Sequence, residues 1–312
     1  MVGYLVRRVL QALVVILGVT IIVFLLSQLI PGGQARAALG PKATPTQLAN
    51  FNHLNGLDRP FLVQYWRYLV DLLHGNLGYS YRNNQGVTSL ILDRLGRTMV
   101  LVGSSTLLAL AIAIPVGIAQ AVRRPPQFSS SQSQDLPAFL AGELLIIIFS
   151  FSLHWLPSQP PSDLSAWGPI THPVDFILPV VTLSLLEVAA FSRYMRSSML
   201  DTLAEDYVRT ATAKGAAPRR VLYGHALRNA ILPILTLIGL TLPAVVGGAL
   251  ITEAIFNYPG MGLLTVQAAS NDDVPLVLGT TLVATIATVA GSLLADLLYA
   301  AADPRIRLEA SS

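Results

Sequence analysis

The sequence predicts an all-α integral membrane protein with six transmembrane helices. Of its 312 residues, 53% are hydrophobic and only 12% are charged, and the mean hydropathy is +0.59. Charged residues make up about a quarter of a typical soluble domain, so this composition does not suit one. Six apolar runs reach or approach the roughly 20 helical residues that cross a hydrocarbon core, and basic residues gather between alternate runs. We therefore expect a single transmembrane domain over residues 1–312.

The expected spans cover approximately residues 10–30, 98–122, 137–156, 174–195, 230–252 and 276–302. The third is the weakest because Glu143 lies inside it. Its eleven Leu, Ile and Phe residues between Phe139 and Leu156 each favour insertion by about 0.3–0.6 kcal/mol, whereas a central carboxylate costs roughly 3 kcal/mol. The balance favours insertion.

Both termini are expected in the cytoplasm because basic residues flank the first and last runs and follow the second and fourth. Loops 157–173 and 253–275 contain no Lys or Arg, as expected of external loops. The external segment 31–97 carries seven, but loops beyond about 60 residues largely escape the charge rule. The basic residues that fix the orientation are Arg7, Arg8, Arg123, Arg124, Arg193, Arg305 and Arg307. We expect a multi-pass protein of a bacterial-type cell membrane.

The external segment contains an amphipathic helix over residues 61–73. Six apolar residues fall on one face, while Arg67 and Asp71 fall on the other. Such a helix suits the outer membrane surface, with its aromatic rings at headgroup level. It either braces the first two spans or forms part of a platform for a delivery protein. The apolar residues are Leu62, Tyr65, Trp66, Leu69, Leu72 and Leu73.

Residues 201–229 form a polar segment between the fourth and fifth runs, and they predict two short helices. Thr202 and Glu205 have the spacing of a capping box. Lys214 suits a last helical turn, and Gly215 suits a left-handed stop. Pro218 suits the first turn of a second helix that continues into the apolar run near residue 230. The pair is either a solvated loop or a docking surface; apolar Tyr207, Val208, Ala211 and Leu222 between basic residues favour docking.

This segment resembles the EAA loop of ATP-binding-cassette importer permeases, the surface that enters a cleft of the ATPase subunit. The resemblance implies a first coupling helix with Asp206, Tyr207, Val208, Arg209, Thr210, Ala211, Ala213, Lys214 and Gly215. It implies a second with Arg219, His225, Leu227 and Arg228.

Most of the chain is similar to the B-type subunit of dipeptide and oligopeptide permeases. The similarity extends to Ile30-Pro31-Gly32, to Leu57-Asp58-Arg59-Pro60, to the run from Phe256 to Gly262, and to the ending from Asp303 to Arg307. It implies a permease subunit that forms half of the translocation pathway for short peptides. Permeases for nickel or glutathione look similar, and an ion-coupled carrier that works alone is an alternative from another class.

The resemblance implies several partners: a second homologous permease subunit, two ATPase subunits that carry ATP and Mg, an extracytoplasmic solute-binding protein, and the lipid bilayer. We expect no cofactor on this chain and no enzymatic activity. No Walker A run surrounds either Lys42 or Lys214, the chain contains no cysteine, and its five histidines lack metal-ligand spacing. The small net charge of +3 follows the topology, so we expect no nucleic-acid binding.

The candidate pathway or gate residues are Glu143, Glu187, Phe256, Pro259 and Gly260. Intramembrane carboxylates such as Glu143, Glu187 and Asp296 mark pathways or proton relays by default. We favour burial against the bundle, with the carboxylates protonated or paired with a residue such as Arg193, over contact with a peptide amino group and over a proton relay. The segment from Phe256 to Leu264 suits a gate that probes the delivered substrate.

Overall fold

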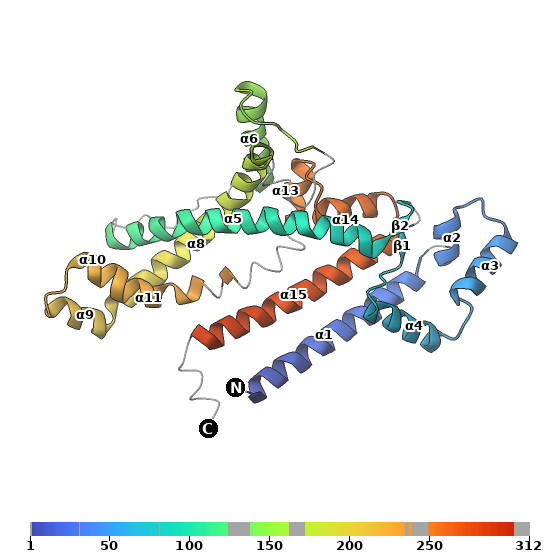
Figure 1. The fold of residues 1–312 in the computed structure, drawn as a ribbon, viewed down its shortest axis with the longest axis horizontal. Coiled ribbons are helices and arrows are strands. Elements are labelled where there is room, and N and C mark those ends of the chain that lie inside the picture. The colour runs from blue at the N-terminus through green and yellow to red at the C-terminus, as the bar shows by residue number, and fades with distance from the viewer. Residues whose placement is uncertain are drawn as a thin grey trace.

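A computed structural model of the chain describes residues 2–30, 32–80, 82–123, 138–161, 172–234, 237–238 and 249–302. The described chain is mainly helical, and its only sheet within these residues is one short hairpin. Figure 1 shows α1 beside α15 with the two helices running in opposite directions, with α9–α11 near one end of the molecule and α2–α4 near the other.

Within the described residues, four helices are long and apolar enough to cross a membrane. They belong to α1 (Val2–Gln28), α5 (Val87–Arg123), η2 with α8 (Pro173–Phe176 and Ile177–Ala204) and α15 (Val274–Ala302). These correspond to the first, second, fourth and sixth predicted spans. The predicted third span contains α6 (Ala138–Leu145) and the π-helix η1 (Ile146–Ser152). Together they are about 22 Å long, short of a hydrocarbon core of about 30 Å.

The fifth predicted span lies largely outside the described residues. Its described parts are residues 230–234, 237–238 and 249–252, which include the end of α11 (Leu227–Ala230) and the start of α13 (Leu250–Ile255). α6 contacts α8 and α13, and Ile146 and Phe149 of η1 pack against the cluster around Phe256, while the rest of α6 and η1 projects from the molecule (Figure 1). Their exposed apolar side chains include Ile147 and Phe151, at 53% and 67% exposure.

α5 and α8 form the most extensive helix pair among the described elements. Ala109 and Ala113 on α5 are fully buried against Phe191 on α8. Small side chains let the two backbones approach closely, which is how helices associate in lipid. α1 pairs instead with α15, so the described spans form two pairs.

The segment that we predicted to be external folds into α2 (Gly33–Leu39), α3 (Pro45–Asn55), α4 (Phe61–Leu73) and a hairpin of β1 (Tyr79–Ser80) with β2 (Gln85–Gly86). α4 has the predicted bounds, but Tyr65 turns toward α1 instead of toward headgroups. Its hydroxyl lies 3.0 Å from the Thr20 hydroxyl, and its ring packs 5.3 Å from that of Phe24. Leu62 and Trp66 stay exposed, because the apolar residues of α4 divide between two faces.

α13, α14 (Met261–Ser270) and the loop between them form a helical hairpin against α5 and the start of α15. Met261 and Leu264 pack with Ile91 of α5 and Leu276 of α15. Phe256 packs with Leu101 of α5 in a second cluster. This hairpin packs between the first turns of α5 and the start of α15.

Candidate functional site

The polar segment folds as α9 (Asp206–Ala213), α10 (Pro218–Arg220), the π-helix η3 (Val221–Ala226) and α11. Gly215 has the predicted left-handed backbone, with φ +81, and Pro218 lies in the first turn of α10. The predicted capping box is wrong because α8 extends through Thr202. The Thr202 hydroxyl donates to the carbonyl oxygen of Ser198 at 2.7 Å, and Glu205, with extended backbone, separates α8 from α9.

Burial of one side chain and two hydrogen bonds hold this segment together and tie it to α8. Val208 of α9 is 3% exposed. The Asn229 amide donates to the Tyr207 hydroxyl at 2.8 Å, which joins α9 to α11. The Ser198 hydroxyl of α8 donates to the carbonyl oxygen of Ala230 at 2.9 Å. Force applied to α9 therefore has a short path of hydrogen bonds and buried contacts into α8.

Apolar packing continues this connection into α5. Ala226 and Ala230 are fully buried among Met195 and Met199 of α8 and Ile118 of α5. Two residues that we expected as exposed docking contacts behave differently: Val208 is buried, and Leu222 packs against this same cluster. They serve the chain's own core because the apolar faces of α9 and η3 turn toward α8.

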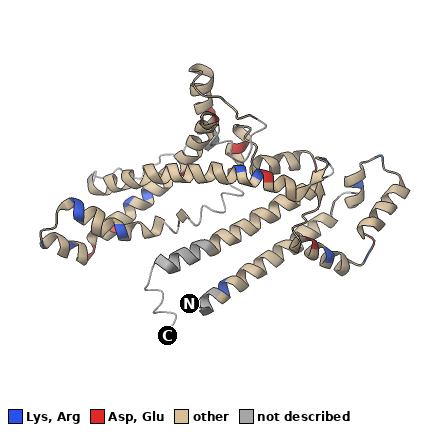
Figure 2. Ribbon diagram, in the orientation of Figure 1, with Lys and Arg blue, Asp and Glu red and all other residues tan. Residues whose placement is uncertain are grey.

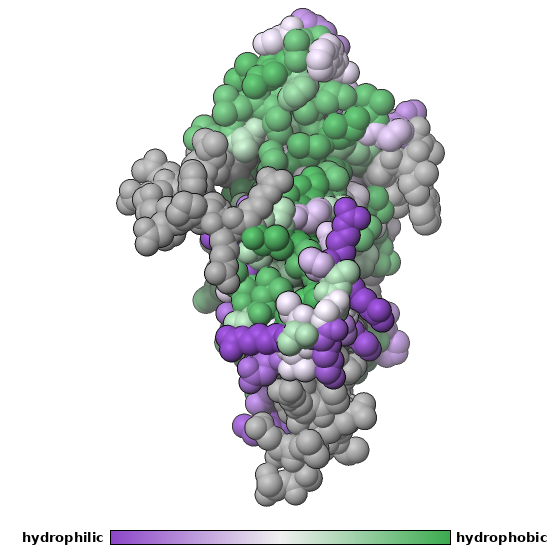
Figure 3. Space-filling model, turned by 90° about the vertical axis from the view of Figure 1, so that its left-hand side faces the viewer, coloured by the Kyte–Doolittle hydropathy of each residue, from purple (hydrophilic) through white to green (hydrophobic). Residues whose placement is uncertain are grey.

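The opposite side of the segment is basic and exposed, and we call its side chains the coupling surface. Figure 2 shows the cations gathered at this end of the molecule, and Figure 3 shows hydrophilic residues there below a hydrophobic region. The ion pair of Arg209 with Asp206, at 3.7 Å, involves side chains 71% and 98% exposed, so solvent screens it strongly. The coupling surface comprises Tyr207, Arg209, Lys214, Arg219, Arg220, His225 and Arg228.

The candidate gate loop is tightly packed. Phe256 and Tyr258 are 0% and 1% exposed, and Pro259 and Gly260 are buried. The Tyr258 hydroxyl donates to the carbonyl oxygen of Arg97 at 2.8 Å. Burial, and secondarily the charge of Glu253, raise the pKa of Tyr258 above its usual value, so the hydroxyl stays protonated. The loop is therefore held against α5.

The carboxylate that organises this loop is Glu253, which we did not single out from the sequence. It is fully buried and accepts hydrogen bonds from the Thr98 hydroxyl at 2.7 Å and from the backbone N–H of Leu263 at 3.0 Å. The N–H of Met261 donates to the same Thr98 oxygen at 2.8 Å. A useful signal was Glu253 shortly before a Pro-Gly-Met-Gly run, because backbone N–H groups near glycines bind carboxylates well.

Two glycines make this arrangement possible. A Cβ on Gly260 would overlap the Glu253 carboxylate, and one on Gly262 would lie 2.5 Å from the Leu250 Cα. The loop therefore closes around the carboxylate only without side chains at these positions. Glu253, Thr98 and the loop form what we call the hairpin clamp.

The other intramembrane carboxylates occupy separate places. Glu143 is exposed on α6, whereas Glu187 on α8 accepts a hydrogen bond from the Thr106 hydroxyl of α5 at 3.1 Å. Oε2 of Glu187 is buried without a hydrogen-bond partner. No interaction joins Glu143 with Glu187 in the described part of the chain, and the side chain of Asp296 lies outside it. Nor do the described residues contain a cluster suited to a metal ion.

Comparison with known proteins assigns two matching regions to the chain. Residues 105–308 match the family described as binding-protein-dependent transport system inner membrane component. Residues 1–102 match the N-terminal part of binding-protein-dependent transport system membrane components.

Individual relatives are similar over almost their full length. A Brucella ovis protein named as a peptide permease is 42% identical over 322 residues, with 99% of this chain and 100% of that protein covered. The oligopeptide transport system permease protein AppB of Bacillus subtilis is 38% identical, with 98% and 99% covered. The glutathione transport system permease protein GsiC of Salmonella paratyphi A is 36% identical, with 98% and 99% covered.

Proposed function

This chain belongs to the family of binding-protein-dependent transport system inner membrane components and is a permease subunit of an ABC importer, and we propose that its cargo is short peptides. Similarity to AppB and to the Brucella ovis protein over nearly the whole chain supports this cargo. The similarity to GsiC makes glutathione the second candidate. Glutathione is itself a small modified peptide, so the two candidates share one chemical class.

The observation that carries the mechanism is the attachment of α9–α11 to α8. Val208, the Tyr207–Asn229 hydrogen bond and the Ser198–Ala230 hydrogen bond link the coupling surface to a span. In the proposal, an ATPase subunit docks on this surface in the cytoplasm and moves when it binds and hydrolyses ATP. Because α8 packs extensively against α5, the two spans rotate together as a rigid pair. This rotation opens the translocation pathway first to one side of the membrane and then to the other.

The hairpin clamp extends this movement to the outer side. Glu253 and Thr98 join the α13–α14 hairpin to α5, so the hairpin travels with α5. The gate residues Phe256, Pro259 and Gly260 thereby open or close the outer end as part of a rigid unit. We further propose six spans with both termini in the cytoplasm, a second permease chain that completes the pathway, a pair of ATPase subunits and an external solute-binding protein.

The test is uptake by the complete transporter in proteoliposomes with its cognate binding protein. We expect ATP-dependent accumulation of labelled di- or oligopeptides, with inhibition by excess unlabelled peptide. Preferential uptake of glutathione or nickel would replace the peptide assignment. Transport by this chain in vesicles that lack ATPase subunits, with loss of activity in Glu187→Gln, would instead establish an ion-coupled carrier.

A further inference from the structure

A cavity of about 520 Å³ lies at the α2–α4 end of the chain. Its apolar part is formed by Val23 and Phe24 near the end of α1 and by Leu278 and Leu282 in the first turns of α15. Its polar part includes side chains of the α2–α4 unit. The volume is in the range of small-molecule sites, about 300–1,000 Å³.

Polar groups in the cavity wall mostly bind one another. The Gln64 amide donates to the carbonyl oxygen of Leu57 at 2.9 Å, and the Gln34 amide donates to the Ser27 hydroxyl at 3.3 Å. The Asn76 side-chain oxygen accepts a backbone N–H at 3.0 Å. These bonds hold the wall in shape before any ligand arrives.

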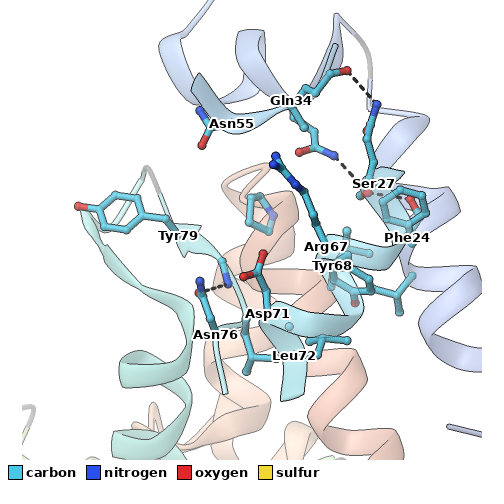
Figure 4. A pocket seen from close by; sticks show the side chains of 18 of the residues that line it. Phe24, Ser27, Gln34, Asn55, Arg67, Tyr68, Asp71, Leu72, Asn76 and Tyr79 are labelled. Carbon is cyan, nitrogen blue, oxygen red and sulfur yellow. Dashed lines mark hydrogen bonds between the residues drawn. The ribbon is translucent and has the colours of Figure 1, made fainter. Parts of the chain in front are cut away.

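Arg67 and Asp71 are the exceptions. Figure 4 shows both side chains directed into the space between α4 and its neighbours. Within the described residues neither side chain has a hydrogen bond or an ion pair. They lie one turn apart on α4, where Cβ atoms are about 5–6 Å from each other. Both residues are exposed, and a cation and an anion at this spacing on the wall of a cavity match a ligand with an adjacent anion and cation.

The depth of the cavity narrows the choice of ligand. The Tyr65 hydroxyl of α4 is hydrogen-bonded to that of Thr20. Thr20 lies about 12 Å along α1 from the end of that helix at Gln28. α4 therefore stands beside the outer part of a membrane span, and Trp66, 68% exposed on its far side, suits headgroup level. The cavity thus combines an apolar floor at hydrocarbon depth with charges at the membrane boundary.

We propose that this cavity binds a zwitterionic phospholipid of the phosphatidylethanolamine type, separate from the transported cargo. Its phosphate lies against the Arg67 guanidinium and its ammonium against the Asp71 carboxylate, while the start of an acyl chain covers Leu278, which is half-buried, unlike the buried Phe24. A soluble zwitterion satisfies the two charges but leaves the apolar surface at Leu278 in water. The lipid satisfies both, and it fills the space between α4 and α15.

The test measures lipid bound to the complete transporter by native mass spectrometry after extraction from membranes of equal phosphatidylethanolamine and phosphatidylglycerol content. We expect retained phosphatidylethanolamine and a loss of about tenfold in Arg67→Gln, the size of one charge-assisted contact. Asp71→Asn should keep bound lipid but remove the preference for ethanolamine. Arg82→Gln and Asp58→Asn, exposed changes outside the cavity, are the matched controls.

A second variant tests the apolar floor without any change of charge. Leu278→Trp fills the cavity and should also release the lipid, whereas the α4 charges remain. Wild-type lipid retention in both Arg67→Gln and Leu278→Trp would overturn the proposal. If soluble glycerophosphoethanolamine bound as tightly as the lipid, the ligand would not need to be a membrane lipid. Displacement of the lipid by a short peptide would make the cavity a cargo site.

Discussion

Replacement of Glu253 by Gln tests the hairpin clamp. The carboxylate accepts hydrogen bonds from Thr98 and Leu263 through different oxygens, at 2.7 and 3.0 Å. A Gln side chain has one oxygen and one NH₂ group, so either the Leu263 N–H or the Thr98 hydroxyl loses its acceptor. A buried donor without a partner costs about 1–3 kcal/mol. A cost of about 2 kcal/mol raises the population of the opened hairpin roughly 30-fold, since 1.4 kcal/mol is a factor of ten.

The absence of native cysteines makes this opening measurable. Leu264 is 5% exposed on α14, so a single cysteine at this position reacts with a water-soluble maleimide mainly when the hairpin opens. We expect Glu253→Gln to increase the labelling rate of Leu264→Cys about 30-fold, by the free-energy difference above. Peptide uptake should fall in parallel.

The matched control is Glu143→Gln, the same chemical change at an exposed position on α6. It should leave the labelling rate unchanged. An unaltered rate in Glu253→Gln, or an equal rise in both variants, would refute the clamp. Thr98→Val removes the shared hydroxyl, and its effect should be strongly non-additive with that of Glu253→Gln because both act on one network.

The coupling surface gives three further predictions. Gly215→Asp places a side chain at φ +81, with a strain of about 1 kcal/mol. The variant should insert into the membrane, but ATP hydrolysis should no longer drive uptake. Gly215→Asn, which is better suited to this backbone, should retain more uptake activity. Tyr207→Phe loses the 2.8 Å hydrogen bond with Asn229 and should cut uptake per ATP hydrolysed while the amount of inserted protein stays constant. Arg209→Ala breaks only an exposed ion pair with Asp206, which contributes about 0–1 kcal/mol, so we expect unchanged thermal stability. Binding of the ATPase subunit should become weaker and less sensitive to salt; unchanged binding would argue against docking at this residue.

The sequence was a good guide wherever one local rule determined the structure. Apolar length predicted four of the spans, and the left-handed preference of Gly215 and the helix-start preference of Pro218 placed the turn between α9 and α10. The amphipathic period of α4 predicted its bounds from Phe61 to Leu73.

Tertiary contacts decided the features that the sequence did not reveal. Thr202 has the spacing of a helix cap, but packing against α11 lets α8 continue past it. Val208 looks like an exposed contact until α9 folds back on α8 and buries it. Glu253 became important only because Thr98, distant in sequence, meets it inside the hairpin.

The central claim is that an ATPase subunit docks on the coupling surface in the cytoplasm. Its most direct test is the location of a single cysteine that replaces Lys214 on this surface. In membrane vesicles containing the whole transporter, we expect an impermeant thiol reagent to label it only from the cytoplasmic side. A cysteine on the ATPase subunit should cross-link to it, with a yield that changes on ATP binding. Labelling from the external side, or peptide uptake that persists without the ATPase subunits, would contradict the account.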